Sequence, residues 1–178
     1  MSKRREGREA AVQYLFQLDL NGSLEQHDSA SFWNLRSGPG KAPVPAKTRA
    51  FTEQLAAGVV AHRAEIDACI QKFTANYAIG RLAAVDRNIL RVAIFEMLHS
   101  PDVAPVIIIN EAIEIAKKFG TEKSGGFVNG ILDRVKKEIG RPARGPAEAG
   151  FRIQESGIRN QNAPVPTPSD SRLLTPDS

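Results

Sequence analysis

One segment, residues 82–99, constrains the fold of this chain more than any other. Apolar residues occupy nearly every side of it between Ile89 and Leu98. A helix that is apolar all round is covered by other elements, so it sits at the centre of its domain. Pro101 and Pro105 end this helix and restart the chain. The segment therefore predicts a bundle of helices packed around one buried helix.

The rest of the first 140 residues shows helical periodicity separated by loop residues. Apolar residues recur at intervals of three and four, which is the spacing of one helix face. Residues 21–46 are rich in Gly and Pro and predict a loop that a short helix interrupts. Aromatic residues make up only 6% of the chain, which disfavours an all-β fold. We predict an all-α domain of five to seven helices, over residues 3–20, 29–35, 47–76 (with a break near Gly58), 82–99, 105–119 and 124–139.

The character of the sequence changes after Gly140. Residues 141–178 contain six of the 11 prolines and few large apolar side chains. Such a segment buries too little surface to offset its ordering entropy. We expect one domain over residues 1–140 and a disordered tail over residues 141–178.

Several classes of protein are disfavoured by absent signals. The single cysteine, Cys69, excludes an internal disulfide framework. No signal-peptide pattern and no apolar run of membrane-spanning length is visible, so we expect a cytoplasmic protein without a membrane partner. No nucleotide-binding fingerprint occurs, and Gly125-Gly126 lacks the lysine of a phosphate loop. The three histidines have no metal-ligand spacing, and we interpret His62 as a core or boundary residue. We expect no enzyme, no metal and no cofactor.

The first turns of the N-terminal helix concentrate positive charge. Lys3, Arg4, Arg5 and Arg8 stand against Glu6 alone in residues 1–8. Cations are unfavourable at a helix N-terminus, so their presence there indicates that they serve a contact with a group outside the helix. They can contact phosphates, or they can form a solvated helix start.

A second cationic segment joins the last two helices. It carries Lys117, Lys118 and Lys123 together with Phe119 and Phe127. Single-stranded RNA is bound by cations that face phosphates and by aromatic rings that stack on bases. The alternative is that the rings are core and the lysines are solvated caps. We expect Phe119 to be core and Phe127 to contact RNA.

Two poor helix formers, Asn129 and Gly130, interrupt the apolar stripe of the last helix. Gly130 would let a neighbouring helix come close, and Asn129 would hydrogen-bond a backbone group or a ligand. A purely structural role for the pair is the alternative.

Four blocks of the chain together resemble the NusB family of transcription antitermination factors. They recur in the family's order and cover most of residues 3–139. The blocks are RREGREAAVQYLFQ (4–17), DRNILRVAIFEML (86–98), INEAIEIAKKFG (109–120) and FVNGILD (127–133). The resemblance implies two small helical subdomains. It also implies binding to boxA, a single-stranded RNA element of ribosomal-operon leaders, together with the ribosomal protein NusE. That pair would act on RNA polymerase with NusA and NusG, without catalysis.

The resemblance also assigns roles to individual residues. Asp86 matches an acidic position that relatives present to NusE, whereas Glu111 and Asn129 match structural positions. Gly125-Gly126 and Lys123 depart from the family pattern next to Phe127. The residues that would contact RNA are Lys3, Arg4, Arg5, Arg8, Lys117, Lys118, Lys123 and Phe127.

Two other functions remain as alternatives. One is an RNA-binding module like the N-terminal domain of rRNA cytosine methyltransferases. The short segment after residue 140 argues against it, because a methyl-transfer domain would not fit there. The other is a helical protein-interaction scaffold that ignores RNA. The sequence leaves a homodimer open.

Overall fold

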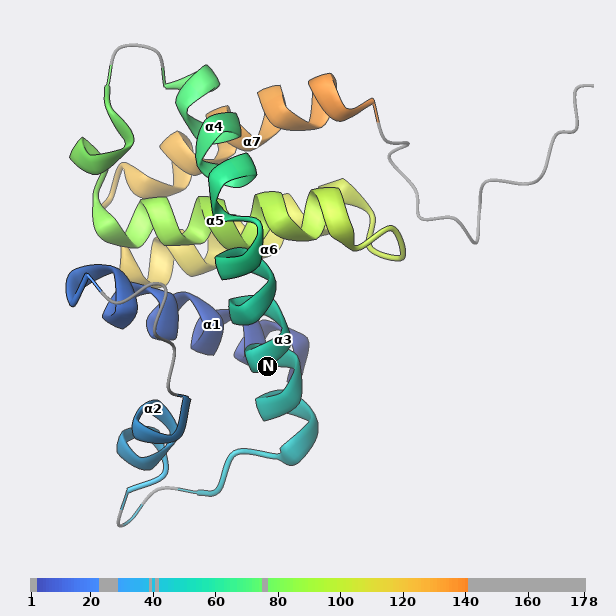
Figure 1. Cartoon of the computed structure of the whole chain (residues 1–178). Coiled ribbons are helices and arrows are strands. Elements are labelled where there is room, and N and C mark those ends of the chain that lie inside the picture. Colours follow the sequence, from blue (N-terminus) through green and yellow to red (C-terminus); the bar gives the residue numbers. More distant parts are fainter. Residues whose placement is uncertain (1–2, 23–28, 39, 41, 75–76, 141–178) are drawn as a thin grey trace, which may run out of the picture.

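The computed structural model describes residues 3–22, 29–38, 40, 42–74 and 77–140. These residues form seven α-helices and one 3₁₀-helix, with no strand among them (Figure 1). The prediction of an all-α bundle of five to seven helices is therefore confirmed. The elements are α1 (Lys3–Leu20), α2 (Ser29–Arg36), α3 (Ala46–Ala61), α4 (Arg63–Phe73), η1 (Ile79–Arg81), α5 (Ala84–His99), α6 (Pro105–Phe119) and α7 (Ser124–Ile139).

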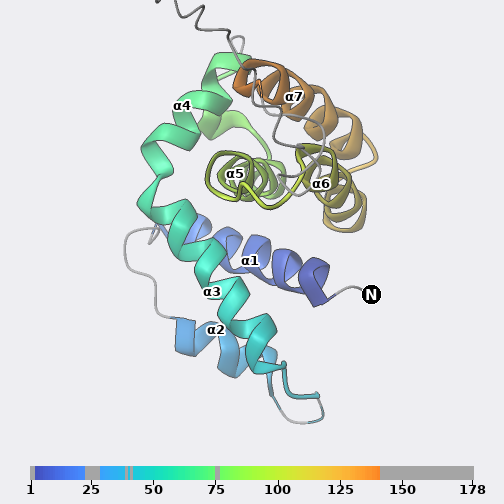
Figure 2. The ribbon, with the colours of Figure 1, turned by 90° about the vertical axis from the view of Figure 1, so that its right-hand side faces the viewer.

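Helix α5 is the centre of the fold, as its sequence predicts. Figure 2 shows it nearly end-on, with α1, α3, α4, α6 and α7 around it. Ile89, Leu90 and Ile94 on α5 are at most 1% exposed. Helices α1 and α3 pack on one side of α5, and α4, α6 and α7 pack on the other (Figure 2). Helix α2 lies farther out, where Phe32 contacts Tyr14 of α1 and Trp33 contacts Arg49 of α3. This arrangement fits two small helical subdomains that share α5.

The long helix predicted over residues 47–76 is two helices, and its break lies at His62. The backbone of His62 has φ −105° and ψ 17°, and it separates α3 from α4. The predicted break near Gly58 is wrong, because Gly58 stays inside α3. A Cβ at Gly58 would lie 2.1 Å from Phe95 of α5, so the glycine allows α3 and α5 to approach.

Buried charges connect the helices across the core. Arg91 of α5 donates two hydrogen bonds to Asp67 of α4, at 2.7 and 2.9 Å, and lies 3.2 Å from Asp19 of α1. Arg87 donates to the same Asp19 carboxylate at 2.9 Å. These pairs fix how α1 and α4 meet the central helix, since a buried charge needs its partner.

In the described part of the chain, no helix is both long and apolar enough to cross a lipid bilayer. The tail predicted over residues 141–178 lies outside the described residues.

Candidate nucleic-acid interface

The four cations at the start of α1 have two different environments. Lys3 and Arg4 are exposed. The Arg5 guanidinium donates to both carboxylate oxygens of Glu111 on α6, at 2.9 and 2.7 Å. Arg8 is buried and donates to both oxygens of Glu96, at 2.7 and 2.8 Å. The expectation that Arg8 presents its charge to phosphates is therefore wrong, because that charge is neutralised inside the bundle.

A groove between α1 and α3 collects the exposed cations. We call it the α1–α3 groove; it has a volume of about 430 Å³ and includes Lys3, Arg4, Lys47 and Phe51 in its lining. The Arg4 guanidinium lies 4.6 Å from the centroid of the Phe51 ring. Sequence reasoning missed Lys47. It lies in the first turn of a helix, where a cation is unfavourable, as the cations at the start of α1 also do.

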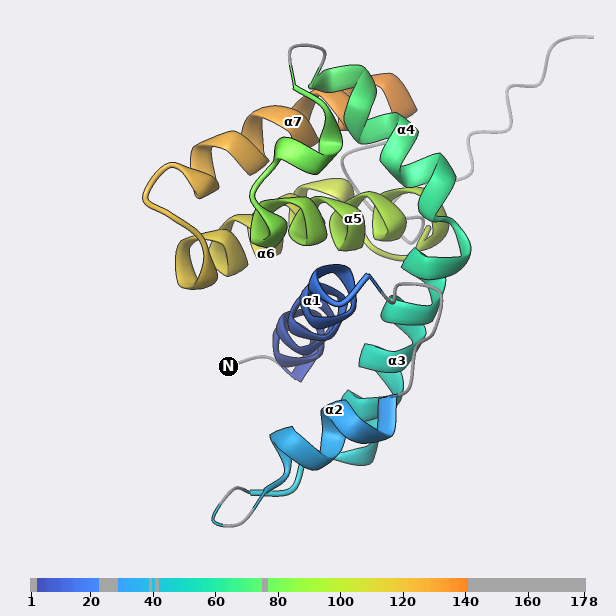
Figure 3. The same cartoon turned by 60° about the vertical axis from the view of Figure 1, so that its left-hand side comes forward.

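The lysines at the end of α6 are engaged with carboxylates. Lys117 donates to Glu114 within α6 at 2.8 Å. Lys118 donates to Glu9 of α1 at 2.6 Å, which ties the two helices together. Phe119 is half-buried against the core, as expected. The start of α1 and the turn between α6 and α7 consequently lie on the same side of the molecule (Figures 2 and 3).

Lys123 and Phe127 line a pocket of about 300 Å³ beside the start of α5. Its lining also includes Tyr77, Arg81 and Asp86. Tyr77 is 61% exposed, so its ring is open to a ligand. Asp86 is 8% exposed, and its Oδ1 accepts no hydrogen bond from the residues that the structure describes.

A second pocket of about 290 Å³ shares Tyr77 and Phe127 and continues along α7 to Gly130 and Arg134. We call the two pockets together the Tyr77–Phe127 groove. Three aromatic rings, those of Phe73, Tyr77 and Phe127, line it together with three cations, Arg81, Lys123 and Arg134. This combination can stack on bases while it attracts phosphates. Sequence reasoning missed Tyr77 and Arg81, because only the tertiary fold brings them beside Phe127. It also missed Arg134, which follows Phe127 by seven residues on the same face of α7.

Of the contacts predicted for Asn129 and Gly130, neither the close helix approach at Gly130 nor a backbone hydrogen bond of Asn129 is found among the described residues. Gly130 is exposed, and a Cβ there would meet nothing within 4 Å. The predicted close approach of a helix at Gly130 is therefore wrong. Asn129 is half-buried, and its side chain makes no hydrogen bond to the described residues. Gly130 instead keeps the Tyr77–Phe127 groove open along α7.

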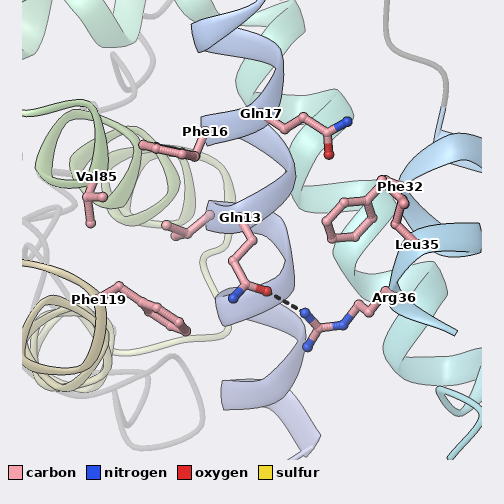
Figure 4. A pocket seen from close by; sticks show the side chains of 9 residues that line it. Gln13, Phe16, Gln17, Phe32, Leu35, Arg36, Val85 and Phe119 are labelled. Atoms are coloured by element: carbon pink, nitrogen blue, oxygen red, sulfur yellow. Dashed lines mark hydrogen bonds between the residues drawn. The ribbon is translucent and has the colours of Figure 1, made fainter. Parts of the chain in front are cut away.

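Another pocket has a different chemistry. Figure 4 shows it along α1, with Val85 and Phe119 on one side and Phe32 and Leu35 of α2 on the other. Its volume is about 500 Å³, and Arg36, the one cation in its lining, donates to Gln13 across it. This lining suits an apolar side chain rather than a phosphate.

The fold and these grooves define a small all-helical domain whose exposed chemistry suits a flexible polyanion with aromatic bases. More specifically, the chain belongs to the NusB family, whose sequence profile matches residues 5–137.

Relatives and solved structures agree with this membership. The chain is 40% identical to the transcription antitermination protein NusB of Sorangium cellulosum, over 81% of this chain and 99% of that one. It is 45% identical to NusB of Geotalea uraniireducens, over 76% of this chain and 94% of that one. The structure matches NusB of T. maritima with a TM-score of 0.66 and 34% identity, covering 83% of this chain and 96% of that one. It matches a chain of a crystal structure of antitermination factors NusB and NusE in complex with dsRNA, with a TM-score of 0.65 and 27% identity, covering 78% and 98%.

Proposed function

We propose that this protein is a transcription antitermination factor that binds boxA RNA of ribosomal-operon leaders together with NusE. The observation that carries the proposal is the Tyr77–Phe127 groove, where three rings and three cations meet beside the turn between α6 and α7. The names of the relatives and the solved NusB and NusE complex with RNA support it. The pair would act on elongating RNA polymerase with NusA and NusG in the cytoplasm, and no step would be catalytic.

The RNA surface that we propose has two parts. Bases stack on Tyr77 and Phe127, while Lys123 attracts the adjoining phosphates. The strand continues toward the α1–α3 groove, where Lys3 and Arg4 hold further phosphates. Arg5, Lys117 and Lys118 already hold carboxylates, so RNA phosphates would compete with these carboxylates for them.

Asp86 is the residue that we propose for NusE. It lies at the start of α5 and lines the same pocket as Lys123 and Phe127. A donor from NusE would satisfy its Oδ1, which is buried without a partner among the described residues. An unsatisfied buried acceptor costs about 1–3 kcal/mol, and a donor from NusE would remove this cost. Because Asp86 lines the same pocket as Lys123 and Phe127, the contact would also couple NusE binding to the RNA groove.

The test is a binding titration of the full chain with labelled boxA RNA, a scrambled single strand and a boxA duplex, each with and without NusE. We expect boxA to bind more tightly than the scrambled strand, and NusE to increase this difference. Stacking on exposed rings requires unpaired bases, so we expect the single strand to bind more tightly than the duplex. Equal binding to boxA and scrambled RNA with NusE present would reject the antitermination factor. If the chain binds none of the RNAs, the result would favour a protein-interaction scaffold.

A further inference from the structure

Three side chains with metal-binding chemistry meet at the joint between α3, α4 and α5. His62 is the break between α3 and α4, Glu65 is in the first turn of α4, and His99 is the last residue of α5. Glu65 Oε2 lies 3.4 Å from His62 Nδ1 and 3.5 Å from His99 Nε2. One ligand atom from each residue lies within 4.8 Å of the other two. The spacing along the sequence concealed this cluster, because 37 residues separate the two histidines.

The distances fit a shared metal ion better than hydrogen bonds. Hydrogen bonds between a charged imidazole and a carboxylate are about 2.7–2.9 Å long, so the Glu65 carboxylate is committed to neither ring. Zinc binds imidazole nitrogen and carboxylate oxygen at about 2.0–2.2 Å, so neighbouring tetrahedral ligands lie about 3.4 Å apart. Both separations from Glu65 match that value. The side chains are 29–55% exposed, so an ion can reach them.

The neighbouring aromatic ring holds both imidazoles in place. The His99 ring stacks on Phe95 with a centroid distance of 5.0 Å and an angle of 29°. The His62 ring lies 5.9 Å from Phe95 and 4.0 Å from His99. Phe95 itself is fixed against Gly58, where a Cβ would collide with it. A ligand set held by packing loses less freedom when it binds a metal.

We propose that His62, Glu65 and His99 form a binding site for a divalent transition-metal ion of which Zn²⁺ is the best match. Two imidazoles and one carboxylate are a known zinc ligand set, and a fourth position stays open to water. The bound ion connects the joint between α3 and α4 to the end of α5. It therefore stabilises the relative placement of the two halves of the bundle, at a site separate from the Tyr77–Phe127 groove.

The experiment is a competition titration of the full chain, without a histidine tag, against a chromophoric zinc indicator. It is run at about pH 7.5, because protons compete with the metal ion for its ligands at lower pH. We expect saturable binding of one Zn²⁺ per chain. Changing even a neighbour of a metal ligand costs about 10–100-fold in affinity. His62→Ala, His99→Ala and Glu65→Gln should therefore each weaken binding by at least about tenfold.

His27→Ala is the matched control, because it removes the remaining histidine, which lies outside the described residues. We expect it to bind Zn²⁺ like the original chain. As a second readout, Zn²⁺ should raise the Tm of the original chain and of His27→Ala, but not that of the three ligand variants. The proposal is overturned by a lack of saturable binding, by binding that survives both His62→Ala and His99→Ala, or by binding that is lost in His27→Ala.

Discussion

Arg8 and Glu96 form a buried, two-pronged ion pair that joins α1 to α5. Their side chains are 6% and 1% exposed, and 88 residues separate them along the chain. Both groups are almost out of contact with water, so the Glu96 carboxylate depends on Arg8, while Arg8 also lies 3.7 Å from Glu111 of α6. The RREGREA block thus contains a residue that builds the fold beside residues that face solvent.

We predict that Arg8→Ala lowers the free energy of unfolding by about 3–5 kcal/mol, because it leaves the buried Glu96 carboxylate without its ion-pair partner. Glu96→Ala should lower it less, because Arg8 keeps Glu111 at 3.7 Å. The double variant Arg8→Met with Glu96→Leu should lose much less, since it leaves neither charge. Urea unfolding followed by circular dichroism measures all three changes. If the double variant is less stable than both single variants, the pair is net stabilising and this argument fails.

A second prediction concerns acid stability and rests on Asp19. Burial alone would raise the pKa of Asp19, but hydrogen bonds from Arg87 and Asn88 and the charge of Arg91 lower it below its ordinary value. A lowered pKa in the folded state contributes stability that is complete above the ordinary value of about 4. That stability is lost as the pH falls through the lower value of the folded state.

We therefore expect unfolding free energy to decrease with falling pH below about 4, and to decrease less steeply in Asp19→Asn. Glu53 and Glu111 also have lowered pKa values, so the difference between the two proteins isolates the share of Asp19. Urea unfolding across this pH range gives the two slopes. Parallel slopes would show that Asp19 does not titrate differently in the folded state.

Local sequence patterns were sufficient to predict the helices, because periodicity and capping act over a few residues. Apolar residues on nearly every side between Ile89 and Leu98 were enough to place α5 at the centre of the bundle. The break at His62 was misplaced because it depends on packing of α3 and α4 against α5, which no local signal shows. The glycine inside the pattern, Gly58, serves the approach of Phe95 instead.

The candidate interface was less predictable, because partners from other helices decide which charges reach solvent. Nothing in residues 1–8 distinguishes the exposed Arg4 from the buried Arg8; the distinction comes from Glu96 on α5. Likewise, Tyr77 precedes the central helix by several residues and meets Phe127 only through the fold. A pattern of residue types and spacings can point to a region of the surface, but the tertiary structure decides which of its charged residues reach solvent.

A third prediction tests the phosphate contacts that we assign to the α1–α3 groove. The triple variant Lys3→Ala, Arg4→Ala, Lys47→Ala should weaken RNA binding. It should also reduce the slope of log K against log salt concentration by roughly 2, since each phosphate contact on a single strand contributes about 0.7. Binding isotherms at four salt concentrations measure the slope.

A matched control removes the same charge elsewhere. Lys72→Ala, Lys136→Ala and Lys137→Ala change the last turns of α4 and α7, outside both grooves. We expect this triple variant to keep a slope close to that of the original chain. If both triple variants reduce the slope equally, only net charge matters and the α1–α3 groove has no special role.

The fourth prediction separates stacking from charge in the Tyr77–Phe127 groove. Tyr77 is 61% exposed, so Tyr77→Ala should leave the free energy of unfolding nearly unchanged. Loss of one base stacked on its ring should cost about 1–3 kcal/mol of RNA binding. The salt slope should stay the same, because no cation is removed.

Tyr77→Phe is the control, because it keeps the ring and removes only the hydroxyl, and it should bind RNA like the original chain. Phe127→Ala should also weaken RNA binding, but Phe127 is half-buried against the core, so its effect must be corrected for stability. Tyr77 is therefore the cleaner test of the two rings. If Tyr77→Ala and Tyr77→Phe weaken binding equally, the hydroxyl rather than the ring contacts the RNA. If neither changes binding, bases do not stack on Tyr77, and the groove loses its more exposed ring.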